Sequence, residues 1–195
     1  MEADKTGTPI VTQPKKSRSS LLQLTIVGAI LAAIALSFGL NVLSQGAPAG
    51  VPSKLADMKL NKNSYVEGAQ ALARVNQLHG TAINLMSAYI AEYSHDFNPY
   101  HTDRARVTVW VGTAGSNDAA TQLLNRMVSG IGNGNEMFGN MQQLNLDGDA
   151  VYQVSGAGGD HFFYQSRKSP DRVIWLTIAE AGNTMSIVEQ ALDEF

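Results

Sequence analysis

The sequence contains no cysteine among its 195 residues. This absence excludes disulfide bridges, cysteine-ligated zinc, thiol nucleophiles and covalent haem attachment. It also excludes the lipidated cysteine by which a lipoprotein is held at a membrane. A folded domain in this chain must therefore be stabilised by packing and hydrogen bonding alone.

Charged residues are scarce as well, at 16% of the chain, and the net charge is −3. Residues 1–20 contain four basic and two acidic side chains, so their charge is +2 and that of the remainder is −3 − 2 = −5. A weakly acidic domain without a basic stripe lacks the electrostatic footprint of a protein that binds a phosphate backbone. We therefore expect no nucleic-acid partner.

Catalytic and cofactor motifs are missing too. The chain has no G-x-S-x-G, no S-x-x-K and no H-E-x-x-H, the motifs of several hydrolase classes. Asp147 and Asp149 flank a glycine, which is the ordinary position of Asp in a turn and gives no support to a glycosidase. We predict a protein that is not an enzyme, with no catalytic, cofactor or metal site.

Two further segments resemble sites only superficially. Ser155–Asp160 (SGAGGD) is rich in glycine, but an aromatic segment follows it where a phosphate-binding loop requires a helix, so it predicts a hairpin turn. His95, Asp96, His101 and Asp103 lie in one loop without the spacing of a known metal site. This loop is interpreted as solvated and polar.

One long apolar run is present. Residues 21–43 (LLQLTIVGAILAAIALSFGLNVL) contain no charge, and at about 1.5 Å per residue a helix of this length crosses a hydrocarbon core about 30 Å thick. Basic residues precede the run, and the next charge after it is Lys54. The positive-inside rule then predicts a cytoplasmic N-terminus and an extracytoplasmic C-terminal domain, on the periplasmic side in a bacterium.

A cleaved signal peptide is the alternative for this run, because Ala47-Pro48-Ala49 loosely resembles a cleavage site. The run is longer than the apolar region of a signal peptide, and a proline lies within the site. An uncleaved signal anchor is therefore favoured.

One side of this predicted helix carries small residues at helical spacing: Gly28, Ala32, Ala35 and Gly39. In lipid, small side chains allow helix backbones to approach closely, which is a main source of attraction between helices. The pattern indicates a transmembrane packing face, although Gly and Ala are also frequent in membrane helices that do not associate.

The remaining chain divides into a linker and one domain. Residues 44–54 are rich in Gly, Pro and small residues and predict a linker. Residues 55–195 are of ordinary domain size. Within them, helices are predicted from a capping box at Ser64–Glu67 to His79, from Ser116 to Ile131, and from a second box at Ser186 and Glu189 to the C-terminus.

Strands are predicted between these helices. Alternating or apolar segments place them at the following ranges: 83–93, 106–111, 144–146, 150–154, 161–165 and 173–178. Asp147-Gly148-Asp149 predicts a tight hairpin, and VIWLTI at 173–178 is apolar on both faces, as in a covered central strand. Consecutive strands favour an antiparallel or mixed sheet with about three packed helices, an α+β domain.

Function is inferred by elimination. The leading hypothesis is a membrane-anchored extracytoplasmic protein-interaction domain, in the manner of an accessory subunit of a membrane complex, with a protein partner in the membrane or at its outer surface. The alternative is a periplasmic-type domain that binds a small or lipidic ligand between sheet and helices. An enzyme of unknown class comes third, and a pocket lined by His161, Tyr164 or the 95–103 loop would favour it.

The charge-free span and its basic flank make one testable prediction about topology. In sealed membrane vesicles, protease should reach the domain after Lys54 only from the non-cytoplasmic side. Residues 1–20 should be digested only from the cytoplasmic side. The reverse pattern would invert the predicted orientation, and a mature N-terminus near Gly50 would show cleavage.

Overall fold

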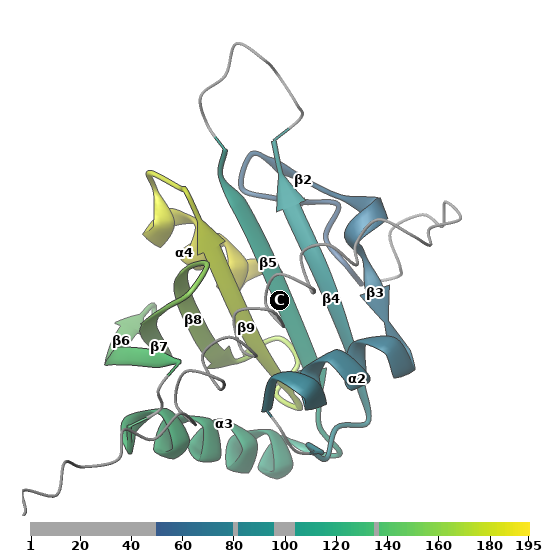
Figure 1. Ribbon diagram of the computed structural model, residues 1–195, viewed down its shortest axis with the longest axis vertical. Helices are drawn as coiled ribbons and strands as arrows, with labels where there is room; N and C mark the ends of the chain where they lie inside the picture. The colour runs from purple at the N-terminus through teal and green to yellow at the C-terminus, as the bar shows by residue number, and fades with distance from the viewer. Residues whose placement is uncertain (1–49, 80–81, 96–103, 135–136) are drawn as a thin grey trace, which may run out of the picture. The chain divides into compact units, whose positions relative to one another are not determined.

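The computed structural model describes residues 50–79, 82–95, 104–134 and 137–195, and the fold below is that of these residues (Figure 1). They belong to one compact unit. The predicted cytoplasmic tail, the predicted span 21–43 and its small-residue face lie outside the described residues. None of the helices described is both long and apolar enough to cross a membrane.

A nine-stranded sheet, antiparallel at every pairing, forms the centre of the domain (Figure 1). Its order is β1-β2-β4-β5-β9-β8-β7-β6, and β3 pairs separately with β4. The strands are β1 (Lys54–Leu55), β2 (Met58–Leu60), β3 (Val66–Glu67), β4 (Ser87–Ser94), β5 (Arg106–Thr113), β6 (Phe138–Leu146), β7 (Asp149–Gly156), β8 (Gly159–Gln165) and β9 (Arg172–Ala179).

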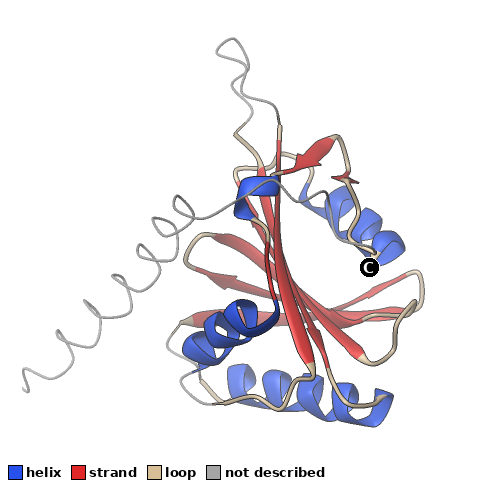
Figure 2. Cartoon of the chain, turned by 90° about the vertical axis from the view of Figure 1, so that its right-hand side faces the viewer, coloured by secondary structure: helices blue, strands red, loops and turns tan. Residues whose placement is uncertain are grey.

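Helices cover both faces of this sheet (Figure 2). The helices are α2 (Gly68–His79), α3 (Asn117–Gly132) and α4 (Thr184–Glu194), and a short 3-10 helix, η2 (Lys62–Ser64), precedes β3. Buried residues of α4 join the largest core cluster, together with the valines of β5. Buried residues of α2 and α3 pack in two smaller clusters on the opposite face. The predicted α+β class is therefore confirmed for the described residues, and the sheet, predicted as antiparallel or mixed, is large and antiparallel.

Strand alternation explains how one sequence supplies both faces. In β5, Val107 and Val109 belong to the cluster under α4, whereas Trp110 packs against the cluster under α2, because successive side chains of a strand point to opposite faces. In β9, Ile174 is buried on one face of the sheet and Val173 is buried on the other. The prediction that residues 173–178 form a covered central strand is confirmed.

Several local predictions are confirmed in detail. Ser116 caps α3, where its hydroxyl oxygen accepts from the Ala119 amide at 3.1 Å. The β6–β7 hairpin turns at Asp147 and Gly148, with φ angles of 52° and 92°, as expected when both central residues of a tight turn need positive φ. The Ser155–Asp160 segment is the β7–β8 hairpin, as predicted.

Both predicted capping boxes are wrong. Residues 66–67 form β3, where Val66 pairs with Ile90, so helix α2 begins only at Gly68. The Glu67 carboxylate accepts from the Tyr65 hydroxyl at 2.9 Å instead of capping a helix. Likewise, α4 begins at Thr184, and Ser186 lies inside it, bonded to Gln190 one turn later. At the first box, Val66 is β-branched and lies beside β4, so pairing with that strand was favoured over the local helix cap.

The N-terminal strands were not predicted from the sequence. β1 and β2 are two and three residues long, which is too short for periodicity to show. Val51, in the segment predicted as linker, is buried against the core, and the Tyr93 hydroxyl donates to the Pro52 carbonyl at 2.9 Å. A fragment used to measure stability should therefore begin at residue 50.

The β7–β8 hairpin supplies a stability prediction. Gly159 has φ of +135°, and a Cβ there would lie 2.1 Å from the Ile178 carbonyl oxygen. Gly159→Ala should therefore lower the free energy of unfolding by at least about 3 kcal/mol, because backbone strain and a clash in a central ladder add together. Urea denaturation of residues 50–195 measures this loss.

Gly130 in α3 is the matched control, because a Cβ there meets no atom within 4 Å. Gly130→Ala should raise the free energy of unfolding by roughly 0.5–1 kcal/mol. Equal stability of Gly159→Ala and wild type would show that the hairpin relaxes around the new side chain.

Candidate functional site: the outer edge of β6

The most distinctive surface among the described residues is the outer edge of β6. This strand is nine residues long and is the last in the sheet order, where it pairs with β7 only. Its sequence, FGNMQQLNL, contains no charged residue and no proline. An edge strand presents a row of backbone N–H and C=O groups to a potential pairing strand. Its length and neutrality leave that row without the usual protection.

The hairpin fixes which groups face outward. The two-residue turn makes Leu146 and Asp149 the closing pair, whose backbone groups bond to each other. Pairs then alternate along the ladder, so the N–H and C=O of Gln143 and Asn145 point away from β7. The Asn145 side chain accepts from the Gly148 amide at 3.1 Å, which fixes the turn beside this edge.

A bulge limits how much of the edge is straight. The register shifts between Gly139 and Gln142, and Asn140 has a positive φ of 52°. Bulges twist a strand away from a regular edge and are one way of blocking further pairing. Residues 142–146 lie beyond the bulge in regular register with β7. This five-residue segment is the part suited to accept another strand.

Apolar side chains line this edge on both faces. Phe138 and Met141 pack beside α3, and Leu144 and Leu146 pack against the main core cluster. All four are only partly buried. Part of their apolar surface therefore remains accessible beside the outward backbone groups.

The opposite edge of the sheet is built differently. There β1 has two residues and β2 three, and each includes a lysine, Lys54 or Lys59. Short length and lysines are common devices that prevent sheets from joining edge to edge. Among the described residues, one edge is thus protected and the 142–146 segment of the other is not.

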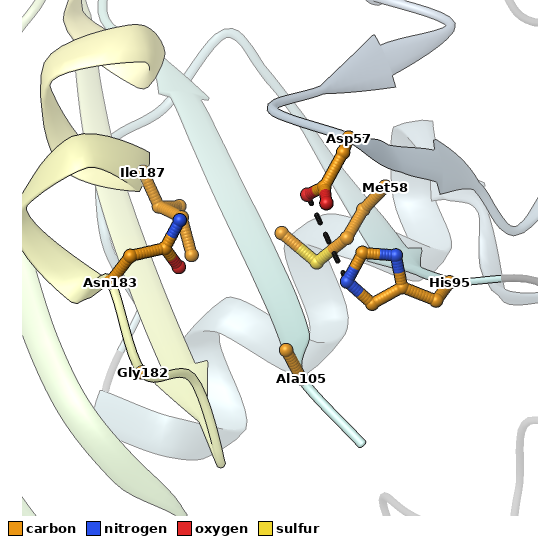
Figure 3. Close-up of a pocket in the computed structure, with 7 residues that line it drawn as sticks. All are labelled: Asp57, Met58, His95, Ala105, Gly182, Asn183 and Ile187. Carbon is orange, nitrogen blue, oxygen red and sulfur yellow. Dashed lines mark ion pairs between the residues drawn. The ribbon is translucent and has the colours of Figure 1, made fainter. Parts of the chain in front are cut away.

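A pocket of about 190 Å³ lies between the start of α4 and the β2 region (Figure 3). The His95 imidazole and the Asp57 carboxylate approach within 3.8 Å on one side of it. The pocket is lined by Asp57, Met58, His95, Ala105, Gly182, Asn183 and Ile187. Its volume is below the roughly 300–1,000 Å³ of typical ligand pockets.

The predicted polar loop contributes only His95 to the described residues, because Asp96, His101 and Asp103 lie outside them. In the part of the chain that the structure describes, no three potential metal ligands converge. His79 lies at the end of α2, where its Nδ1 is 2.8 Å from the Val75 carbonyl. It therefore interacts with a carbonyl of the last turn of the helix.

His161 is a core residue of β8. Its Nε2 lies 3.1 Å from the Ala157 carbonyl, and its Nδ1 lies 3.1 Å from the Thr177 hydroxyl. A carbonyl only accepts, so Nε2 donates, and the neutral ring accepts from Thr177 through Nδ1. The ring packs edge-on to Phe138 and beside Trp175. Both ring nitrogens are used in structural bonds.

Two other residues singled out from the sequence, Asp149 and Tyr164, have structural positions in the fold. Asp149 accepts from Arg167 at 3.2 Å, and the same guanidinium pairs with Asp193 of α4. Tyr164 and its neighbours on β8 are buried in the core, on both faces of the strand. The pocket beside His95 does not include His161 or Tyr164.

Sequence reasoning missed the edge itself. It predicted only residues 144–146 of β6, because Asn and Gln are poor strand formers and Gly139 and Asn140 interrupt the alternation. The informative feature was the neutral run from Phe138 to Leu146, because each of the other described strands contains a charged residue.

His161 predicts a pH dependence of stability. Burial lowers the pKa of His161, against smaller opposing effects of the Ala157 carbonyl and Asp160. The unfolded imidazole, with a pKa of about 6.5, binds a proton that the folded one resists. Stability should therefore fall as the pH drops from about 6.5 toward the lowered folded pKa, with a slope of at most about 1.4 kcal/mol per pH unit.

Urea denaturation of residues 50–195 at several pH values between about 7.5 and 5.5, a range that spans the unfolded pKa, measures that slope. His161→Gln should flatten it, because the substitution removes the buried imidazole. Parallel profiles for wild type and His161→Gln would assign the pH dependence to other groups.

Among the described residues, the sheet edge and the pocket are two surface features that offer something to bind. Comparisons with protein-family models, with curated proteins and with solved structures found no match to the chain.

Proposed function

We propose that the chain is a membrane-anchored protein-interaction protein whose extracytoplasmic domain binds its partner by strand addition at β6. The observation that supports this most directly is the regular, uncharged segment 142–146 at the end of the sheet. In strand addition, backbone hydrogen bonds supply affinity and alternate side chains supply specificity. The outward N–H and C=O groups of Gln143 and Asn145 offer the backbone hydrogen bonds. The partly buried side chains of Leu144 and Leu146 offer the side-chain contacts.

The anchor proposal rests on the sequence. The apolar span 21–43 and the basic residues before it favour a single-pass protein with a cytoplasmic N-terminus. Tethering raises the effective concentration of a domain at a surface, so a short strand edge can serve where free association would be weak. The face formed by Gly28, Ala32, Ala35 and Gly39 would add a second contact within the bilayer.

A second candidate function is binding of a small ligand in the pocket beside His95. The observation in its favour is the cavity itself, with an imidazole, a carboxylate and the Asn183 side chain around it. Against it, about 190 Å³ is smaller than most ligand sites. The edge of β6 is therefore better suited to bind a protein strand than the pocket is to bind a small ligand.

Site-specific photocrosslinking in intact cells tests the binding edge. A photoreactive residue in place of the exposed Gln142 should give a discrete protein adduct, and one in place of exposed Asp118 on α3 should not. Adding Gln143→Pro should reduce the adduct at least about tenfold, because it removes one outward N–H and its ring hinders a neighbouring strand.

Gln143→Thr is the matched control, since it removes the same side chain but keeps the backbone donor, and it should retain the adduct. Replacing Gly28 and Ala32 together with Leu separates the bilayer contribution, and the adduct at position 142 should persist. No adduct at position 142 above the level at position 118 would overturn the proposed function.

A further inference from the structure

The partner at this edge can be specified further, on the basis of the proposed function. We infer that β6 pairs antiparallel with β6 of a second copy of this chain, with Leu144 on the two-fold axis. The two sheets then continue into each other. Four features of the described residues lead to this inference: backbone alternation, charge, apolar surface and the position of the bulge.

Backbone alternation selects the register. Gln143 and Asn145 have the outward N–H and C=O groups, as the pairing with β7 requires. In an antiparallel pair, residues that exchange hydrogen bonds must both present such groups. Gln143 opposite Asn145 of the second copy satisfies this condition twice, once on each side of the axis. The pairing gives about four backbone hydrogen bonds, two for each such pair.

This register places Leu144 opposite itself. Residues between two hydrogen-bonded pairs form a non-hydrogen-bonded pair, in which the side chains lie closest together. Leu144 is only partly buried within its own copy, where it packs against the core cluster that includes Val151. Its remaining apolar surface would be covered by the same residue of the second copy. Gln142 would likewise lie beside Leu146.

The lack of charge on β6 explains why this surface can face the same surface of a second copy without repulsion. A two-fold contact uses the same surface twice, so a charge near the axis faces its own image. Like charges directly opposite each other on paired strands are destabilising. No charged residue occurs from Phe138 to Leu146, although the chain after residue 20 has a net charge of −5. Asp147, the first charge beyond the strand, lies away from the axis in each copy.

The bulge sets the length of the contact. It interrupts regular pairing before Gln142, and the hairpin ends the strand at Leu146. Residues 142–146 are therefore centred on Leu144, and a two-fold axis through that residue uses the whole regular segment. A register displaced by two residues would pair the bulge or the turn with a regular strand.

Cysteine crosslinking of the full-length chain tests the register, because the natural sequence has no cysteine. Leu144→Cys should form an interchain disulfide under mild oxidation in native membranes, since a non-hydrogen-bonded pair has a Cα separation of about 4.5 Å, within the range that a disulfide bridges. Gln143→Cys should crosslink at least about tenfold less, because its image is diagonal at more than about 7 Å. Asp118→Cys controls for random collisions.

A second measurement protects the test against a folding defect in Leu144→Cys. Differently tagged copies of the natural, cysteine-free chain should co-purify in mild detergent, and Gln143→Pro should reduce their co-purification at least about tenfold, whereas Gln143→Thr should not. Association of the tagged copies through residues 21–43 alone would survive Gln143→Pro, and that result overturns the inference.

The two proposals can fail separately. An adduct at position 142 that contains a different protein, with no interchain disulfide in the Leu144→Cys variant and no co-purification of tagged copies, overturns the second-copy inference and leaves the proposed function intact. Absence of any adduct at position 142, together with absence of the disulfide, overturns both.

Discussion

The ladder between β5 and β9 is the constraint on which the rest of the domain depends. Residues Arg106–Thr113 pair with Arg172–Ala179 over eight positions, and this pairing joins two groups of strands that are otherwise local in sequence. One group is β1 to β5, and the other is the meander of β6 to β9. The main core cluster under α4 contains residues from both groups, so α4 covers a continuous sheet face only because this ladder joins them. The unprotected edge of β6 is therefore the far end of one continuous sheet.

How much of this could be read from the sequence depended on the range of the interactions. Local features were readable: the Ser116 cap, the Asp147-Gly148 turn and the alternation of β5 each depend on neighbours within a few residues. The β5–β9 pairing joins segments that are distant in the sequence. Neither segment has a sequence feature that identifies the other as its pairing partner. Strands β1 to β3 are two or three residues long and exist only because β4 offers a partner to β2 and β3.

The same distinction applies to the candidate site. The lack of charge in residues 138–146 is visible in the sequence, but it has meaning only once the strand is known to be at an edge. Conversely, the residue types that usually indicate chemistry were poor guides. His161 and Asp149 are bonded within the fold, and burial of the aromatic residues of β8 on both faces follows from helices that cover both sides of the sheet. The groups that β6 offers to a partner are backbone N–H and C=O groups, which sequence motifs do not identify.

Edge protection also explains why the domain uses its two edges differently. A sheet with two unprotected edges that paired with copies of itself would extend without limit, because each added copy would present a new edge. Here β1 and β2 are short and contain Lys54 and Lys59, which blocks growth on that side. A two-fold contact through residues 142–146 uses the remaining edge of both copies and leaves none open. The asymmetry between the edges thus permits a closed pair and opposes a fibre, so an uncharged edge strand need not lead to open-ended association of sheets.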